Sequence, residues 1–174
     1  MAILKYGSKE VGTSKVDLLY GSRVWRAFVD TVEPIENAIG TSIILSVNDV
    51  PFVGTIIGGD DNIGRGSYIV AGGKGAWRLR VGPVSLRSDS GVRLSTAANH
   101  LLDAMTIASP NAVESLVIND GTRVLGNAWL PIEDNASALL DELCSSWYVN
   151  RNGETVLYGS SSVVIDSTRY AVSK

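Results

Sequence analysis

Alternating apolar and polar positions dominate the first half of the chain. Residues 22–30 alternate with a period of two, which is typical of a strand with both faces at least partly covered. Two apolar runs, Ser42–Val47 and Pro51–Ile57, flank the favoured turn pair Asn48-Asp49, and together they predict a β-hairpin. Gly54 within the second run indicates a bulge or a close approach of another backbone segment.

The segments around this hairpin extend the same pattern. Glycines interrupt residues 1–22, which predict a loose arm or short strands. A polar loop is expected over Gly58–Gly66, and strands are expected at 67–71 and 76–81, joined by a hairpin turn at 72–75. About five strands with short turns predict a small antiparallel barrel or sandwich.

The periodicity changes after Gly91 to that of helices. Apolar residues three and four positions apart predict a helix over Ala97–Met105, capped by Ser95 or Thr96. The same spacing predicts a second helix over Asn135–Ser146. The second half of the chain therefore differs in class from the first.

Two further hairpins are predicted in the second half. One spans 116–125 around the turn Asn119-Asp120-Gly121, and the other spans 147–158 around residues 150–153. A last strand is expected at 163–165. The helices should pack on the sheet that these hairpins form, with a core of Leu101, Leu102, Leu139 and Leu143.

The amino-acid composition indicates that the protein is a subunit of an assembly. The chain has 174 residues, and only 19% of them are charged, against about 25% in ordinary soluble domains. The mean hydropathy is +0.15. Since fewer charges meet the solvent than usual, we expect part of the surface to be covered by other subunits. The net charge of -3 and the pI of about 5.1 argue against a basic nucleic-acid-binding domain.

Candidate catalytic groups are sparse. The single Cys144 excludes an intrachain disulfide, and with the single His100 it could form a nucleophile–base pair, but both fall on predicted helices without an orienting group. Residues 72–75 lack the helix start that a phosphate loop needs, and Asp60-Asp61-Asn62 lacks the spacing of a calcium loop. We expect no enzyme activity, no cofactor and no metal. We also expect no signal peptide and no membrane insertion by this chain.

Four tryptophans stand out among the large side chains. Each begins or lies in a predicted strand, where it could pack in the core or be exposed at an interface. The four are Trp25, Trp77, Trp129 and Trp147. Both alternatives stay open at this point.

Three segments resemble bacteriophage tail hub proteins of the baseplate or tail tip. They are Ile44–Ile57, which contains VNDVPFVGTI, Leu94–Met105, which reads LSTAANHLLDAM, and Trp129–Gly159, which reads WLPIEDNASALLDELCSSWYVNRNGETVLYG. The resemblance covers about residues 22–160. It implies a tail-tube-like β-barrel joined to a small α/β domain.

The expected fold is therefore α+β, with an antiparallel β-barrel and an N-terminal arm over 1–90 and a hub-type α/β domain over 91–174. The resemblance implies a structural protein of the virion, assembled in the bacterial host cytoplasm. Its partners would be identical subunits in a ring, the tail tube, the spike and other baseplate proteins, with DNA passing through the lumen. Hub proteins commonly carry two barrels and form trimers, whereas this chain has one predicted barrel. Six copies or three are therefore both open, and a ring of six needs no second barrel protein.

We expect the apolar hairpin to lie at a subunit interface, because its side chains would otherwise face water. The polar loop is expected at a contact or at the lumen, where its acidic residues would repel passing DNA, and a solvated turn is the alternative. The candidate interface residues are Ile44, Phe52, Ile56, Asp60, Asp61, Arg65 and Trp25. The alternative from another class is a carbohydrate- or receptor-binding module that uses Trp25 or Trp77 as a stacking platform.

Overall fold

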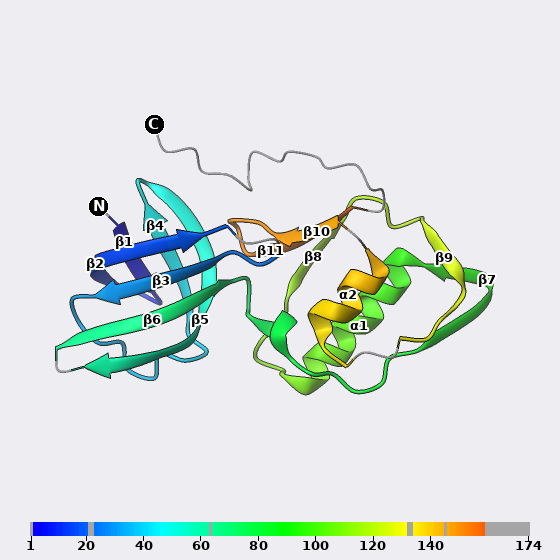
Figure 1. Ribbon diagram of the computed structural model, residues 1–174, viewed down its shortest axis with the longest axis horizontal. Coiled ribbons are helices and arrows are strands. Elements are labelled where there is room, and N and C mark those ends of the chain that lie inside the picture. Colours follow the sequence, from blue (N-terminus) through cyan, green and yellow to red (C-terminus); the bar gives the residue numbers. More distant parts are fainter. Residues whose placement is uncertain (1, 21–22, 63, 132–133, 145, 159–174) are drawn as a thin grey trace. The chain divides into compact units, whose positions relative to one another are not determined.

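A closed six-stranded antiparallel barrel forms the first of two compact units in the computed structural model (Figure 1). The structure describes residues 2–20, 23–62, 64–131, 134–144 and 146–158. Around the barrel the strands follow the order β1-β2-β3-β6-β5-β4. Their bounds are β1 Ala2–Tyr6, β2 Lys9–Leu19, β3 Arg26–Thr31, β4 Ser42–Val47, β5 Val50–Asn62 and β6 Arg65–Gly72.

The hairpin β4–β5 confirms the strongest sequence signal. Its turn residues Asn48 and Asp49 have φ values of 48° and 64°, the left-handed pair that a two-residue turn between twisted strands requires. The side chains of Ile43, Leu45 and Phe52 fill the barrel interior. Local turn chemistry and alternation are therefore sufficient to define this part of the barrel.

Strands β1 and β2 decide between the two alternatives for this segment, strands and not a loose arm, although β2 with 11 residues is longer than the short strand expected. They are wall strands of the barrel, and β1 pairs with both β2 and β4. The register of β2 shifts between Thr13 and Lys15. A bulge at this point moves the alternation to the other face, which hides the strand from a period-two pattern.

The polar loop expected over Gly58–Gly66 is instead the far end of the long hairpin β5–β6. Strand β5 continues to Asn62 and pairs with β6 down to Asn62↔Arg65. The bulge lies between Ile56 and Gly58, and Gly54 is the position of close approach. A Cβ on Gly54 would lie 2.8 Å from Cη2 of Trp25, so glycine makes room for the indole.

Residues 149–154 are hydrogen-bonded to the barrel near the end of β6. The backbone N–H of Val149 donates to the carbonyl of Arg23, and the N–H of Val53 donates to the carbonyl of Arg151. Trp25 Nε1 also donates to the carbonyl oxygen of Asn150 over 3.1 Å. A segment more than a hundred residues away in the sequence is therefore fixed to this part of the barrel.

The second unit contains the described residues Ala76–Tyr148 and Thr155–Tyr158. Two corrections concern its strands. The strand expected at 76–81 is a 3-10 helix, so residues 72–75 lead into η1 instead of turning a hairpin. The turn at 119–121 separates strands of different sheets. The elements are η1 Ala76–Arg78, β7 Leu86–Arg93, α1 Leu94–Ala108, β8 Ser115–Ile118, β9 Val124–Trp129, α2 Ala136–Leu143, β10 Ser146–Val149 and β11 Glu154–Tyr158, with sheets β10-β11-β8 and β7-β9.

The helices bury the predicted stripe with one exception. Leu101, Leu139 and Leu143 are at most 1% exposed, whereas Leu102 is only partly buried. Asn135 caps α2, but Ser95 does not cap α1, because its hydroxyl donates to the carbonyl of Gly121. The expected α+β class, a barrel with a small helix-containing part, is confirmed. The expected strand at 163–165 lies outside the described residues.

Among the described residues, the barrel unit comprises the chain up to Gly75 together with residues 149–154, which form the tip of the β10–β11 hairpin. The expected division into domains 1–90 and 91–174 stays a prediction.

Candidate interface on the barrel surface

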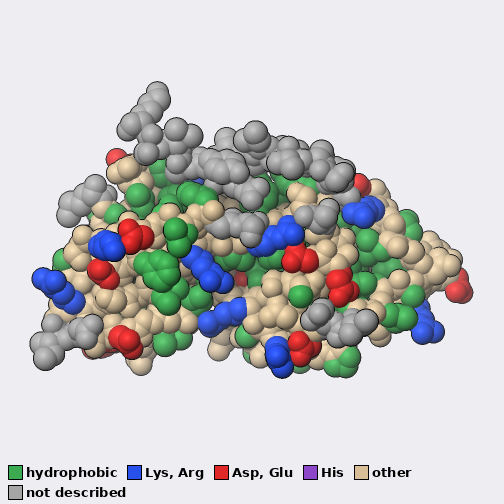
Figure 2. Space-filling model, viewed as in Figure 1, with side chains coloured by type: hydrophobic (Ala, Val, Ile, Leu, Met, Phe, Trp, Pro, Cys, Tyr) green, Lys and Arg blue, Asp and Glu red, His purple; other side chains and the backbone are tan. Residues whose placement is uncertain are grey.

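The outer face of β2, β3 and β6 presents an exposed aromatic ring. Phe28 lies on β3, between Asp17 on β2 and Ile69 on β6 in the strand register. Its side chain is 47% exposed, although its neighbours Ala27 and Val29 point inward and are buried. Figure 2 shows hydrophobic side chains gathered over β2 and β3, with acidic and basic side chains around them. We refer to this surface as the Phe28 face.

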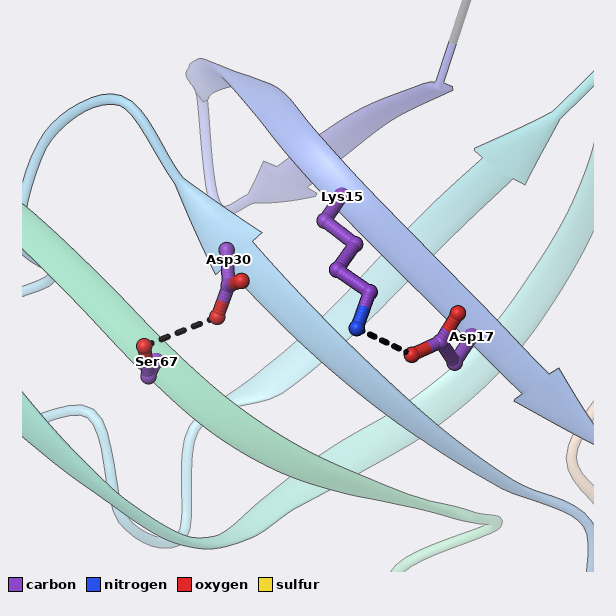
Figure 3. A network of polar contacts seen from close by, with 4 residues as sticks. All are labelled: Lys15, Asp17, Asp30 and Ser67. Atoms are coloured by element: carbon purple, nitrogen blue, oxygen red, sulfur yellow. Dashed lines mark hydrogen bonds and ion pairs between the residues drawn. The ribbon is translucent and has the colours of Figure 1, made fainter.

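Two pairs of polar side chains lie on the same three strands as Phe28. Figure 3 draws these four side chains. Lys15 Nζ lies 2.8 Å from Asp17 Oδ2, and Ser67 Oγ donates to Asp30 Oδ1 over 2.8 Å. The hydrogen bond to Asp17, followed by the attraction of its charge, raises the pKa of the Lys15 ammonium. Lys15 therefore stays charged at neutral pH. The pair is exposed, so it contributes little to stability.

A second exposed apolar side chain lies on β4. Ile44 is 41% exposed and stands between Lys5 on β1 and Val53 on β5. Lys5 Nζ forms an ion pair with Glu10 Oε1 at 2.5 Å. Lys74 Nζ donates to Ser42 Oγ over 3.1 Å, beside the start of β4. We refer to this surface as the Ile44 face.

The far end of β5–β6 carries the predicted acidic residues. Tyr68 donates its hydroxyl proton to Asp61 and accepts the backbone N–H of Ile35 over 2.6 Å. Burial of the phenol, and then its hydrogen bond to Asp61, raise the pKa of Tyr68 above its ordinary value. Tyr68 therefore stays a neutral donor at physiological pH. A shallow depression of about 340 Å³ adjoins this pair, lined by Asn37, Ala38, Ile39, Gly59, Asp61 and Tyr68.

The predicted interface residues divide into two groups in the structure. Phe52 and Ile56 have no exposed surface and Trp25 is 2% exposed, so all three form the barrel core. Their apolar character is explained inside the subunit. The exposed group comprises Ile44, Asp60, Asp61 and Arg65.

The sequence reasoning missed Phe28 as a surface residue. The signal was present, because Phe28 shares its side of the alternating strand with Arg26, and Trp25 lies on the other side. An arginine on a strand face marks the side that meets water. The structure places Arg26 and Phe28 outward and Trp25 inward.

The four tryptophans are buried in the cores of the two units. Trp25 packs edge-on against Phe52 at 5.6 Å, and Trp77 packs against Trp147 at 5.6 Å. Trp77 Nε1 donates to Thr155 Oγ1 over 2.6 Å. Trp129 is 7% exposed, and its Nε1 has no hydrogen-bond partner among the described residues.

The other candidate groups occupy structural positions. Cys144 is 1% exposed, and its Sγ lies 2.7 Å from the carbonyl oxygen of Tyr158. His100 lies within α1. Within the described ranges no cluster of three or more His, Cys, Asp or Glu side chains could hold a metal ion. In the same part of the chain, no helix is long and apolar enough to span a membrane.

Comparison with solved structures identifies the fold. The 43 kDa tail protein of prophage MuSo2 from Shewanella oneidensis superposes with a TM-score of 0.63 at 12% identity, over 90% of this chain and 53% of that one. A tail protein from Neisseria meningitidis MC58 superposes with a TM-score of 0.60 at 17% identity, over 90% of this chain and 50% of that one.

The chain thus has the fold of these phage tail proteins, and it spans about half of their length. No family model matches the sequence, and no curated protein matches it either.

Proposed function

We propose that this chain is a structural component of a phage tail, a hub or tube-proximal adaptor ring at the baseplate or tail tip. In this role it connects the tail tube to the spike and to the surrounding baseplate proteins. The observation that carries the proposal is the match of 90% of the chain, barrel and helical unit together, to two phage tail proteins.

The surface of the barrel supports an assembling role. Phe28 and Ile44 are large apolar side chains that stay partly in water in the single chain. Burial of such side chains against another subunit is favourable by roughly 25 cal/mol per Å². The low charged fraction of the sequence points the same way. We therefore propose a non-enzymatic protein without a cofactor, whose function rests on its surfaces.

The single barrel among the described residues is the basis for our proposal on the number of copies. The described residues 76–158 form two small sheets, two helices and η1, and they contain no second barrel. A six-fold tube end offers six equivalent positions to barrel domains. We propose a ring of six identical chains, with three copies beside a different barrel protein as the alternative count.

The acidic end of β5–β6 fits a position at the lumen. Asp60 and Asp61 are both exposed there, with Arg65 as the neighbouring cation. Carboxylates repel the phosphates of passing DNA by Coulomb's law, so that DNA slides without sticking. The protein would then be part of the virion and would be assembled in the host cytoplasm.

The alternative of a carbohydrate- or receptor-binding module depends on Trp25 or Trp77 as an exposed ring. Such a module needs an exposed aromatic ring in a concave site. Trp25 and Trp77 are each 2% exposed, and both indole nitrogens donate hydrogen bonds inside their own unit. Neither ring can therefore serve as a stacking platform.

Negative-stain electron microscopy of the purified chain tests the proposed function. We expect closed rings with a central channel, because each subunit carries exposed apolar side chains on its barrel. The same sample without rings, as monodisperse single particles over a range of concentrations, would argue for a free binding module and against a ring protein.

A further inference from the structure

We infer that residues 32–41 form a strap across one end of the barrel, that this strap opens while the barrel stays folded, and that the Tyr68 hydroxyl holds it closed. The inference concerns the single chain and does not depend on the proposed ring. The strap connects β3 to β4 and contains no helix or strand. Ile35 and Ala38 are its only buried residues, and most of the others are exposed.

The course of the strap follows from the order of the strands. In the closed order β1-β2-β3-β6-β5-β4, strand β4 is three positions from β3 in either direction, so their connection passes from one side of the barrel to the other. Ile35 has no exposed surface in this passage, and its backbone N–H donates to the hydroxyl of Tyr68 over 2.6 Å. Tyr68 is itself 3% exposed and lies opposite the buried Val29 of β3. The strap therefore covers the barrel end with Ile35 on its inner side.

Hydrogen bonds to the barrel are concentrated at the two ends of the strap. The backbone N–H groups of Val32 and Gly40 donate to carbonyl oxygens on β2 and β5. Among the described residues, only one hydrogen bond joins the middle of the strap, residues 34–39, to a barrel strand, and it is the bond from Ile35 to Tyr68. A single hydroxyl therefore fastens the middle of the strap.

The Tyr68 side chain is fixed firmly on the hairpin β5–β6. Its hydroxyl donates to Asp61 while it accepts the N–H of Ile35. The ring lies against two glycines, because a Cβ on Gly59 would lie 2.8 Å from Tyr68 Cδ1 and a Cβ on Gly66 would overlap the ring. The position of the hydroxyl is thus set by the barrel, and the strap binds to it.

A depression separates the strap from the hairpin beside this hydrogen bond. Residues 37–39 of the strap line it on one side, and Gly59, Asp61 and Tyr68 line it on the other, around a volume of about 340 Å³. Continuous packing therefore does not hold the strap against the hairpin here. Segments with few buried side chains and few hydrogen bonds are those that open locally in native proteins.

Opening of the strap leaves the pairing of the barrel strands intact. β3 pairs with β2 and β6, and β4 pairs with β1 and β5, and none of these ladders includes residues 33–40. An open strap would bring Ile35 into water in addition to Ile39, which is already 64% exposed. The closed strap therefore keeps an apolar side chain of the barrel end hidden in the folded chain.

Hydrogen–deuterium exchange of the full-length chain tests the strap without any substitution, with mass-spectrometric fragmentation that resolves single amides. The Ile35 amide should be protected, yet it should exchange at least about tenfold faster than the Val29 amide of β3. Low urea concentrations should change the rate at Ile35 little, because a local opening exposes little new surface. Equal rates and equal urea dependence at the two amides would mean that the strap opens only with the barrel, and no protection at Ile35 would mean that nothing holds it closed. Either result overturns the inference.

Tyr68→Phe tests the hydroxyl, since it keeps the ring between the two glycines. Loss of this hydrogen bond should accelerate exchange at Ile35 by about tenfold, still with little dependence on urea. Tyr6→Phe is the matched control on β1, because it removes the same atom from a hydroxyl that has no hydrogen-bond partner among the described residues. It should leave exchange at Ile35 as in the wild type.

The variants can contradict the role of Tyr68 in three ways. Exchange at Ile35 that stays at the wild-type rate in Tyr68→Phe overturns it. Equal acceleration by Tyr6→Phe would indicate a general loosening of the barrel and overturns it as well. A Tyr68→Phe chain that is unfolded by circular dichroism would show that the hydroxyl holds the barrel and not the strap, which also overturns it.

Discussion

The barrel and the helical unit bury their apolar residues in different ways. In the barrel, every strand pairs on both sides, and the core comes from alternate residues such as Leu45 and Phe52. In the helical unit, the core comes from helix stripes such as Leu101 and Leu139, and the sheets have only two or three strands among the described residues. A partner can therefore recognise the closed barrel mainly through its side chains, whereas small sheets also offer strand edges.

This comparison predicts that the barrel is the part least tolerant of charge. Ile56 has no exposed surface, and Ile56→Asp would place a carboxylate in the closed core without a partner. The substitution should lower the free energy of unfolding by more than about 4 kcal/mol, which is enough to prevent folding of many domains. Loss of the folded fraction in circular dichroism would show it. A folded, assembly-deficient Ile56→Asp chain would instead support the expected interface role of this residue.

The helical unit should respond to lost volume. Leu139→Ala removes a fully buried side chain from α2 and should cost about 2–5 kcal/mol in urea unfolding. Leu102→Ala is the control on α1, because Leu102 is only partly buried and leaves a smaller cavity. Equal losses for both variants would contradict the observed orientation of α1.

How far the sequence predicts this molecule depends on how local each feature is. The β4–β5 hairpin follows from Asn48 and Asp49, and the α2 stripe follows from residue spacing. The attachment of residues 149–154 to the barrel does not, because no pattern in that hairpin indicates that Arg23 and Val53 are its neighbours. The bulge in β2 likewise hides a strand whose alternation it breaks.

The candidate interface residues were also predictable only as far as local sequence determines them. Ile44, Asp60, Asp61 and Arg65 lie on the surface, where a partner can reach them. Apolar residues in a barrel hairpin alternate between core and surface, and the inward or outward direction of each follows from pairing in three dimensions. The sequence pattern therefore predicted an interface role for Phe52 and Ile56 as well as for Ile44, although only Ile44 points outward.

A substitution at Gly72 tests how tightly the barrel core is packed around Trp25, beside the tip of the β10–β11 hairpin. A Cβ at Gly72 would lie 2.5 Å from Trp25 Nε1, the atom that donates to Asn150. Gly72→Ala should therefore destabilise the barrel by about 1–3 kcal/mol through overpacking. At Gly82 nothing lies within 4 Å of an added Cβ, so Gly82→Ala should leave stability unchanged or raise it by up to about 1 kcal/mol. Thermal unfolding of both variants decides whether the indole is held as tightly as the structure indicates.

The smallest expected effect concerns the start of α2. Asn135 Oδ1 accepts the backbone N–H groups of Ser137 and Ala138 at 3.1 and 3.4 Å. Asn135→Ala should cost about 1 kcal/mol in guanidinium unfolding. Thr96→Ala, at the exposed first turn of α1, should change stability by no more than about 0.5 kcal/mol, because Arg93 and not Thr96 occupies the cap position there. A reversed order would contradict the observed caps.

The mass of the wild-type assembly tests the central claim most directly. One closed barrel among the described residues, with exposed apolar side chains on its surface, leads us to expect a ring of six chains of 18.5 kDa each. Size-exclusion chromatography with light scattering should give this mass without added partners. A mass of a single chain at every concentration, or of three chains, would contradict the account.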